Sequence, residues 1–326
     1  MNGIIALILS GLLFAHDDHN WLTDKKAYEF TQNTQPRQVD VTNFQNLKSP
    51  ATIDMSFFTK KLREFTGLDP IFINGEKQFI SERRSDGYRN LAISFLETEF
   101  KELGYTTSQK NYTGGGWYPR KGTNLISEKI VNTDHKTLVL VSHYDSVGNA
   151  GANDNGTGTI GMLSIAKALK DAELKYNLRF IQFDQEELGL IGSRAYVKQL
   201  SEKEKDNILA VINVDMIGTN TQKDNKFHVM DCNREDSIPF ANSVLKVIKA
   251  YNINLQHVPG CTTRSDHAAF WQQEIPAILI SENFFGGDSD PCYHRRCDVF
   301  DDRIRLEYVQ SILVALATTT KHLVAK

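Results

Sequence analysis

Residues 180–193 read FIQFDQEELGLIGS, an apolar segment of strand character that leads directly into two consecutive glutamates, Glu186 and Glu187. In chains that alternate strands and helices, the carboxyl ends of the strands face the ligand. Two adjacent carboxylates at such an end can divide two tasks, one binding a metal ion and the other moving a proton. A Glu-Glu dipeptide alone is more often a solvated surface turn, so this interpretation depends on the rest of the chain.

Three other apolar, β-branched segments of strand length also lead into potential metal ligands. Strand ends that meet at one edge of a sheet bring such side chains together, so we expect one shared site. The ligands are His143 and Asp154 after residues 138–141, Asp215 after residues 208–214, and His294 after residues 277–280.

Together with the glutamate pair, two imidazoles and several carboxylates form a ligand set of nitrogen and oxygen without a thiolate. Such a set suits zinc better than copper(I) or an iron–sulfur cluster. It contains more ligands than one tetrahedral ion accepts. Two ions about 3.5 to 4 Å apart, sharing one carboxylate and a bridging water, would use all of them. We therefore expect a centre of two Zn²⁺ ions.

Six segments of the chain carry a family resemblance, and in chain order they read HYDS, GANDNGTG, DQEELGLIGS, NVDMIG, RSDHAAF and PCYHRRCD. Their content and order resemble the zinc aminopeptidases of metallopeptidase family M28, especially its short secreted bacterial members. The resemblance covers roughly residues 79–324. It implies an enzyme of the zinc-dependent exopeptidase type, whose substrates are peptides with a free amino terminus.

The resemblance also implies a role for each candidate residue. The five metal ligands would be Asp154, which bridges the ions, His143 and Asp215 on one ion, and Glu187 and His294 on the other. Glu186 is then the general base, because a carboxylate beside the metals can accept a proton from water and pass it to the leaving amine. Spacing alone does not decide which of the two glutamates is the ligand.

Supporting roles follow from the same resemblance. Asp145 would receive the second N–H of the His143 imidazole, and Tyr293 would donate a hydrogen bond to the oxyanion of the tetrahedral intermediate. Arg264 would line the pocket for the substrate's amino terminus. The alternatives are an ordinary strand-end aspartate, a packed tyrosine and a surface arginine. Asp266 and His267 are expected to support the site from behind a helix start, and neither is expected to be a ligand.

The loop around Asp154 reads NDNGTG. Gly156 and Gly158 would let the backbone pass close to the metals, and Thr157 can cap the helix that follows. In the family that the chain resembles, the peptide bond after the bridging aspartate is usually cis. We expect the same bond here.

Composition agrees with a soluble enzyme. The chain has 326 residues, of which 40% are hydrophobic and 24% charged, and its formal net charge is -3. This length can bury a large core, and nothing in the charge pattern indicates nucleic-acid binding. We expect a monomer that acts on a small or peptidic molecule.

Residues 4–14, IIALILSGLLF, have the length of the apolar core of a signal peptide and are too short to span a bilayer. We expect residues 1–15 to be a signal peptide, and the protein to be secreted or periplasmic; a buried first helix is the alternative. No cysteine follows this run to carry a lipid, so no stable membrane anchor is expected. Residues 16–50 resemble an extended arm or short propeptide, which leaves 51–326 as the peptidase domain.

Four cysteines are present. Cys292 and Cys297 flank Tyr293 and His294 at a spacing that allows a small disulfide loop, and this loop resembles one in secreted relatives. Zinc binding by these thiols competes with that interpretation, but the ligand set is complete without them. Cys232 and Cys261 could form a second bridge or stay free, since four cysteines allow three pairings.

Strand-like and helical segments alternate after Gly104, which predicts a three-layer α/β/α sandwich with a mixed, mostly parallel sheet. Helices are expected near residues 55–65, 81–103, 159–169, 193–199, 239–252, 266–272 and 303–322. Phe284, Phe285 and Trp271 are candidates for an apolar substrate pocket.

Three functions fit these patterns: a two-zinc aminopeptidase, a glutaminyl cyclase with one zinc, and a catalytically silent ectodomain. Relatives of the cyclase type replace the NDNGTG loop and carry a long insertion after the glutamate pair. Here only residues 188–191 separate Glu187 from Gly192. Because every expected ligand and the base are present, the aminopeptidase is the preferred interpretation.

Overall fold

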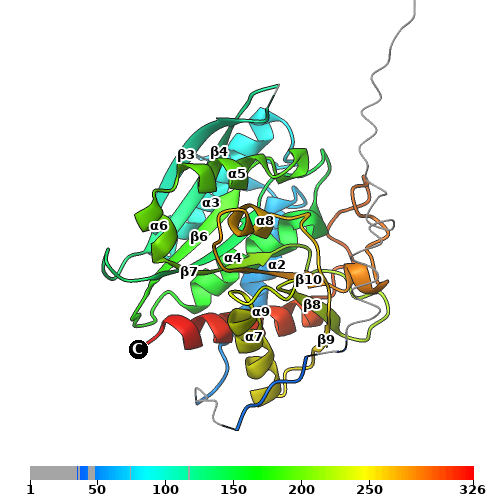
Figure 1. Cartoon of the computed structure of the whole chain (residues 1–326). Coiled ribbons are helices and arrows are strands. Elements are labelled where there is room, and N and C mark those ends of the chain that lie inside the picture. Colours follow the sequence, from blue (N-terminus) through cyan, green and yellow to red (C-terminus); the bar gives the residue numbers. More distant parts are fainter. Residues whose placement is uncertain (1–34, 36, 43–47, 74, 117) are drawn as a thin grey trace, which may run out of the picture.

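The structure is a computed structural model that describes residues 35, 37–42, 48–73, 75–116 and 118–326 (Figure 1). The expected signal peptide, residues 1–15, and most of the expected arm, residues 16–50, lie outside the described residues. Among the described helices, none combines the length and apolar character that crossing a bilayer requires.

An eight-stranded mixed sheet forms the centre of the molecule, with strand order β3-β4-β6-β5-β7-β10-β8-β9. The four middle strands, β6, β5, β7 and β10, are parallel to one another. In chain order the strands are β3 (Thr106–Gly114), β4 (Arg120–Lys129), β5 (Thr137–His143), β6 (Asn177–Phe183), β7 (Ile208–Val214), β8 (Lys226–Met230), β9 (Gln256–Val258) and β10 (Ala277–Glu282). A separate two-stranded hairpin pairs β1 (Ile71–Ile73) with β2 (Glu76–Gln78).

Helices cover both faces of this sheet, with α5 and α8 on one face and α4 and α9 on the other (Figure 1). The helices are α2 (Met55–Phe65), α3 (Asp86–Glu102), α4 (Gly158–Ala168), α5 (Ile191–Gln199), α6 (Glu202–Asn207), α7 (Ile238–Ala250), α8 (His267–Trp271) and α9 (Leu306–Val324). This arrangement is the α/β/α sandwich that the alternation of segments predicts.

The middle strands are buried on both faces, because alternate side chains of one strand enter two different cores. In β5, Leu138 and Leu140 pack into the larger core with α2, α3, α4, α7 and α9. Val139 and Val141 pack into the smaller core, where Phe270 of α8 also lies. Continuous apolar runs were therefore the correct signal for these strands.

One helix begins later than expected from the sequence, and another helix was not expected. The helix expected over residues 81–103 begins at Asp86, because Ser85 has extended backbone and the preceding Arg83 is drawn into the interior by hydrogen bonds to distant carbonyls. Helix α6 was not expected, because it has almost no apolar residues. It is held at its start by a capping box in which Ser201 and Glu204 each bond the other's backbone N–H.

Candidate metal centre

The five expected metal ligands converge at the carboxyl end of the parallel strands. His143 is the last residue of β5, and Asp154 lies in the loop that joins β5 to α4. Asp215 directly follows β7, Glu187 lies in a short 3₁₀ turn after β6, and His294 lies in the loop after β10. Each ligand comes from a different strand end or loop, so the parallel arrangement is what assembles the cluster.

The five side chains form two groups that share one carboxylate. In the first group, Nε2 of His143 lies 3.3 Å from Oδ1 of Asp154 and 3.3 Å from Oδ1 of Asp215. In the second, Nε2 of His294 lies 3.1 Å from Oδ2 of Asp154 and 3.0 Å from Oε2 of Glu187. Asp154 thus turns one oxygen toward each group, and each group offers three ligand atoms within 4.8 Å of one another.

The electrostatics of this cluster fit a bound cation. Burial alone lowers the pKa of His143, but the carboxylates of Asp215, Asp145 and Asp154 outweigh burial and raise it well above its usual value. The pKa of His294 is raised in the same way to about 11, against the effect of burial, by Glu187 and Asp154. Positive charge is therefore stabilised at the centre of both groups. Imidazole nitrogens and carboxylate oxygens are also the ligands that zinc accepts.

Glu186 belongs to neither group, although it directly precedes Glu187. It lines the cavity above the cluster. Burial raises its pKa well above the usual value, and the carboxylates of Glu187 and Asp215 add to this effect, while His143 opposes it. A carboxylate with a raised pKa beside the ligands is suited to accept and return a proton.

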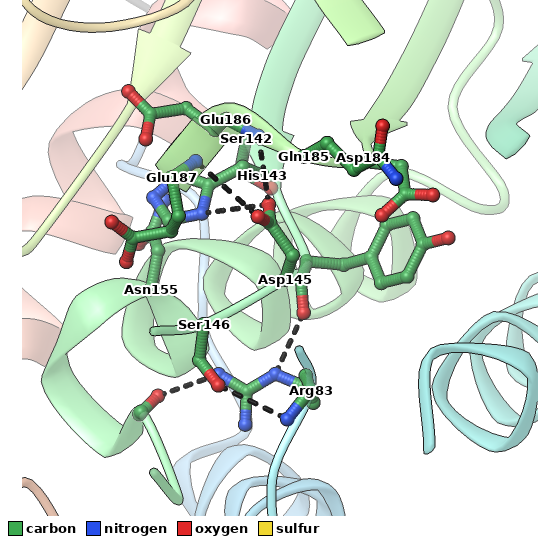
Figure 2. A network of polar contacts seen from close by, with 12 residues as sticks. Arg83, Ser142, His143, Asp145, Ser146, Asn155, Asp184, Gln185, Glu186 and Glu187 are labelled. Carbon is green, nitrogen blue, oxygen red and sulfur yellow. Dashed lines mark hydrogen bonds and ion pairs between the residues drawn. The ribbon is translucent and has the colours of Figure 1, made fainter. Parts of the chain in front are cut away.

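Asp145 connects three parts of the centre (Figure 2). Its Oδ1 accepts the backbone N–H of Glu186 at 3.0 Å, and its Oδ2 accepts that of Glu187 at 3.3 Å. Oδ1 also lies 3.4 Å from Nδ1 of His143. One buried carboxylate therefore positions both glutamates and faces the far side of a ligand imidazole.

Arg83 anchors the loop between His143 and Asp154 from below (Figure 2). Its side chain is completely buried, and it donates from Nε to the carbonyl of Tyr144 at 2.7 Å and from Nη2 to that of Gly151 at 2.8 Å. It also donates to the carbonyl of Ala150 and lies over the ring of Phe65. Burial lowers the pKa of the guanidinium to about 10, which leaves it charged at neutral pH.

A second buried side chain, Asp298, also holds the Asp154 loop. Asp298 accepts the backbone N–H of Asn153 at 2.7 Å and that of Asp154 at 3.1 Å. The peptide bond between Asp154 and Asn155 is cis, as the family resemblance implies. Neither Arg83 nor Asp298 was assigned a role from the sequence. Asp298 ends the PCYHRRCD segment, but a buried aspartate has no spacing that reveals its partner.

The expected capping role of Thr157 is wrong. Its hydroxyl donates to the carbonyl of Asn153 at 2.9 Å and accepts from the backbone N–H of Ile217 at 3.1 Å. The side chain of Asn155 does the capping instead, because its Oδ1 accepts the N–H of Gly158 at 3.0 Å. A Cβ on Gly158 would lie 2.2 Å from that same oxygen, so only glycine fits there.

A cavity of about 380 Å³ lies above the two groups. Tyr293 lines it and stacks on the ring of His294, with 3.8 Å between the ring centroids. Arg264 lines the same cavity as an exposed side chain. Acidic, basic and apolar side chains line this cavity together. The residues that line it are Asp154, Glu186, Glu187, Gly189, Leu190, Arg194, Asp215, Met216, Thr262, Thr263, Arg264, Ser265, Leu279, Ser281, Phe284, Phe285, Tyr293 and His294.

The apolar part of this cavity was only partly expected. Phe284 and Phe285 line it, whereas Trp271 does not, because the Trp271 indole is buried and donates to the carbonyl of Ala277 at 3.0 Å. Met216 and Leu279 complete the apolar wall. These two residues gave no separate signal, because each lies in or directly after a largely apolar strand.

The segment that leads into α8 contacts Asp215. Ser265 donates to Oδ2 of Asp215 at 2.6 Å, an interaction that the sequence did not indicate. His267 begins α8, and its Nε2 lies 3.0 Å from the carbonyl oxygen of Thr262. Asp266 is fully buried next to it, and burial raises its pKa to about 7. Neither belongs to a ligand group.

The structure joins the cysteines in two disulfides. Cys292 and Cys297 bracket Tyr293 and His294 in one short loop. Cys232 and Cys261 form the second bridge, which resolves the pairing that the sequence left open. No cysteine therefore remains as a thiolate ligand.

Comparison with known proteins agrees with this geometry. The model of "Peptidase family M28" matches residues 124–319. The chain is 37% identical over 185 residues to "Aminopeptidase YwaD" of Bacillus subtilis (strain 168), an alignment that covers 53% of this chain and 39% of that protein. The chain thus spans well under two thirds of the length of this relative.

Solved structures share the fold. A zinc aminopeptidase from Bacillus subtilis, BSAP, aligns with a TM-score of 0.74 at 15% identity and covers 85% of this chain and 96% of that one. A glutaminyl cyclase from Bacteroides thetaiotaomicron aligns with a TM-score of 0.68 at 16% identity, over 83% and 98% of the two chains. Because both activities occur on this fold, the family assignment depends on the match over residues 124–319. That match, together with the ordered motifs and the converging strand ends, shows that the chain belongs to peptidase family M28.

Proposed function

We propose that residues 51–326 form a metallo-aminopeptidase domain that releases the amino-terminal residue of peptides with the help of two zinc ions. One observation carries this proposal: two ligand groups share Asp154, while Glu186 stands beside them and outside both. The name of the relative in Bacillus subtilis and the zinc enzyme among the structural neighbours support it.

The five converging residues would hold the ions, with His143, Asp154 and Asp215 on one and Asp154, Glu187 and His294 on the other. Zinc bound there would polarise the carbonyl of the scissile bond and lower the pKa of a water molecule at the centre.

Glu186 then acts as the general base. It accepts a proton from the attacking water and delivers it to the leaving amine. The raised pKa of this carboxyl makes it a stronger base toward that water. Tyr293 donates its hydroxyl hydrogen toward the carbonyl oxygen as negative charge develops there. Burial raises the pKa of Tyr293 well above its usual value, so the hydroxyl keeps the proton that it donates.

The cavity binds the amino-terminal residue of the substrate through its carboxylates and through its apolar wall. The substrate ammonium lies close to the carboxylates of Asp215 and Glu186, which neutralise its charge. The side chain of the substrate's amino-terminal residue contacts the apolar wall formed by Met216, Phe284 and Phe285. Arg264 lines the edge of this pocket. An apolar wall of this kind favours an apolar amino-terminal residue.

We also propose that the protein acts outside the cytoplasm as a monomer. The apolar run at residues 4–14 supports export, and the two disulfides suit an oxidising compartment. Detection of the protein without residues 1–15 in the medium or periplasm of an expressing cell would support this part, and its retention in the cytoplasm would contradict it.

The Glu186→Gln variant tests the assignment of the base. We expect turnover of leucine amide to fall by at least about 10²-fold, because the amide side chain cannot accept a proton. Zinc content, measured by atomic absorption, should stay near two ions per chain.

The matched variant is Asp154→Ala, which removes the shared ligand. It should lose zinc as well as activity, since both groups depend on Asp154. Substantial turnover by Glu186→Gln, or two retained zinc ions in Asp154→Ala, would contradict the respective role.

An amino-terminal glutaminyl peptide distinguishes the alternative function. An aminopeptidase releases free glutamine, whereas a cyclase releases ammonia and leaves a cyclised amino terminus. We expect free glutamine without ammonia, measured by mass spectrometry and an ammonia assay.

A further inference from the structure

A second cavity, of about 690 Å³, adjoins the one above the metal centre. The two cavities share Gly189 and Arg194 in their linings, so they are neighbours along the start of α5. The lining of the second cavity consists of Thr113, Gly114, Gly115, Gly116, Pro119, Leu188, Gly189, Ile191, Arg194, Ala195 and Lys198. The second cavity therefore lies beside the one above the ligand groups, between α5 and the end of β3.

Glycines let the two sides of this second cavity approach each other. The end of β3 lies against the first residue of α5, and a Cβ on Gly114 would lie 2.7 Å from Cγ2 of Ile191. Gly115 has a positive φ of 96°, which a residue with a side chain rarely adopts. A Cβ on Gly115 would also lie 3.4 Å from Cδ1 of Ile191, so glycine at both positions lets the end of β3 pass close to the start of α5.

Charged residues line both cavities. The first is lined by the carboxylates of Asp154, Glu186, Glu187 and Asp215, which two bound zinc ions would neutralise, and by Arg194 and Arg264. The charged residues that line the second are both cations, Arg194 and Lys198. They lie four residues apart on α5, so their side chains leave the helix on the same face.

Both cations are exposed, and within the described part of the chain neither takes part in an ion pair. None of the described residues that line the second cavity carries a carboxylate. The carboxylate of a peptide that extends from the metal centre past α5 would meet these two cations, and this charge complementarity would favour its binding there.

We propose that the second cavity binds the part of the peptide that follows the scissile bond, and that Arg194 and Lys198 recognise a carboxylate there. This inference rests on the proposed aminopeptidase function and adds a substrate class to it. The preferred substrates are short peptides whose carboxylate, either at the carboxyl terminus or on an acidic side chain, reaches α5.

The test uses peptides of two to five residues that begin with leucine and continue with glycine. Each peptide with a free carboxyl terminus is compared with its carboxyl-terminal amide. For at least one length, the wild-type enzyme should show a kcat/KM about fivefold higher for the free carboxylate, the size expected for contacts with exposed cations. The ratio should fall as salt is raised, because mobile ions screen exposed charges.

The double variant Arg194→Gln/Lys198→Gln should reduce this ratio to about one. The matched control is Lys203→Gln on α6, an exposed cation that lines neither cavity, and it should keep the wild-type ratio. A general loss of folding would lower both rates together without removing the ratio, so the ratio reports recognition of the carboxylate.

Two further measurements complete the test. Leucyl-glutamyl-glycine amide against its glutaminyl counterpart separates recognition of an acidic side chain from recognition of the terminus. Calorimetry with the zinc-loaded Glu186→Gln variant measures binding of the same pairs without turnover. If the wild-type protein cleaves none of these peptides, the aminopeptidase proposal fails, and the binding ratio still decides the role of the cavity.

Equal binding of carboxylate and amide at every length, with no preference for the glutamyl peptide, would overturn the proposal. A preference that survives unchanged in the double variant would overturn the roles of Arg194 and Lys198.

Discussion

Asp145 shows how much of the centre depends on a residue that touches no substrate. Its two oxygens hold the backbone N–H groups of Glu186 and Glu187, which fixes the turn that separates the proposed base from the proposed ligand. The same side chain faces Nδ1 of His143. Removing this single carboxylate would therefore loosen both halves of the centre at once.

Replacing Asp145 with asparagine tests this connection. The amide nitrogen cannot accept a hydrogen bond, so one of the two N–H groups loses its acceptor. We expect zinc affinity or kcat/KM to fall about 10- to 100-fold, measured by competition with a metal chelator and by turnover of leucine amide.

A matched control is Asp134→Asn, at an exposed aspartate whose nearest cation, Nζ of Lys203, is 3.7 Å away. This variant should keep both properties. If Asp145→Asn changes neither zinc affinity nor kcat/KM, the turn is held by other contacts.

At the scale of elements, the loop after β10 carries two residues of the proposed site and is closed by a short disulfide. Tyr293 and His294 lie between Cys292 and Cys297, so the disulfide restricts the two residues that would bind zinc and the oxyanion. The second disulfide closes a much longer segment, with a sequence separation of 29 against 5. Cys232 and Cys261 lie outside both ligand groups.

The two disulfides should therefore have separable effects. Replacing Cys232 and Cys261 with alanine should reduce the free energy of unfolding by about 3.5 kcal/mol, against about 2 kcal/mol for Cys292 and Cys297, because the longer loop restricts the unfolded chain more. Activity should show the opposite order, with the larger loss of kcat for the short loop.

Urea unfolding and kinetics of the two double variants test this order. If the Cys292 and Cys297 variant keeps wild-type zinc affinity and kcat, the loop is positioned by its other contacts. One such contact is the N–H of Cys292 to the carboxylate of Asp290 at 2.8 Å.

At the scale of the whole molecule, burial in the two cores also determines how stability responds to acid. His228 on β8 is fully buried, and its Nδ1 lies 2.8 Å from the carbonyl oxygen of Val258. Burial lowers its pKa to about 4, so the folded protein keeps this imidazole neutral. An unfolded histidine binds a proton near pH 6.5.

Between pH 6.5 and about 4, the unfolded chain therefore binds a proton at His228 that the folded chain does not. The contribution of His228 to the free energy of unfolding is complete above pH 6.5 and decreases by up to about 3 kcal/mol as the pH falls to 4. Wild type and His228→Gln, compared by urea unfolding of the zinc-free proteins, should differ by an amount that shrinks over this range. Parallel curves at all pH values would contradict the prediction.

The sequence alone determined the framework of the site. Apolar β-branched runs identified β5, β6, β7 and β10, because strands buried on both faces must be apolar throughout. Ligand residues directly after these runs had to meet, since parallel strands end at the same edge of a sheet. The order of the six motifs then led to the family.

Only the tertiary structure decided how that framework is held and what surrounds it. Arg83 reaches the carbonyl of Gly151, and Asp298 reaches the N–H of Asn153, across 68 and 145 positions of sequence. The pairing of Cys232 with Cys261, the exclusion of Trp271 from the cavity and the open space beside Arg194 arise in the same way. Local periodicity reports which face of an element is buried, but it does not identify the distant side chain that completes a hydrogen bond or leaves a cavity. Those details follow from the packing of all layers together.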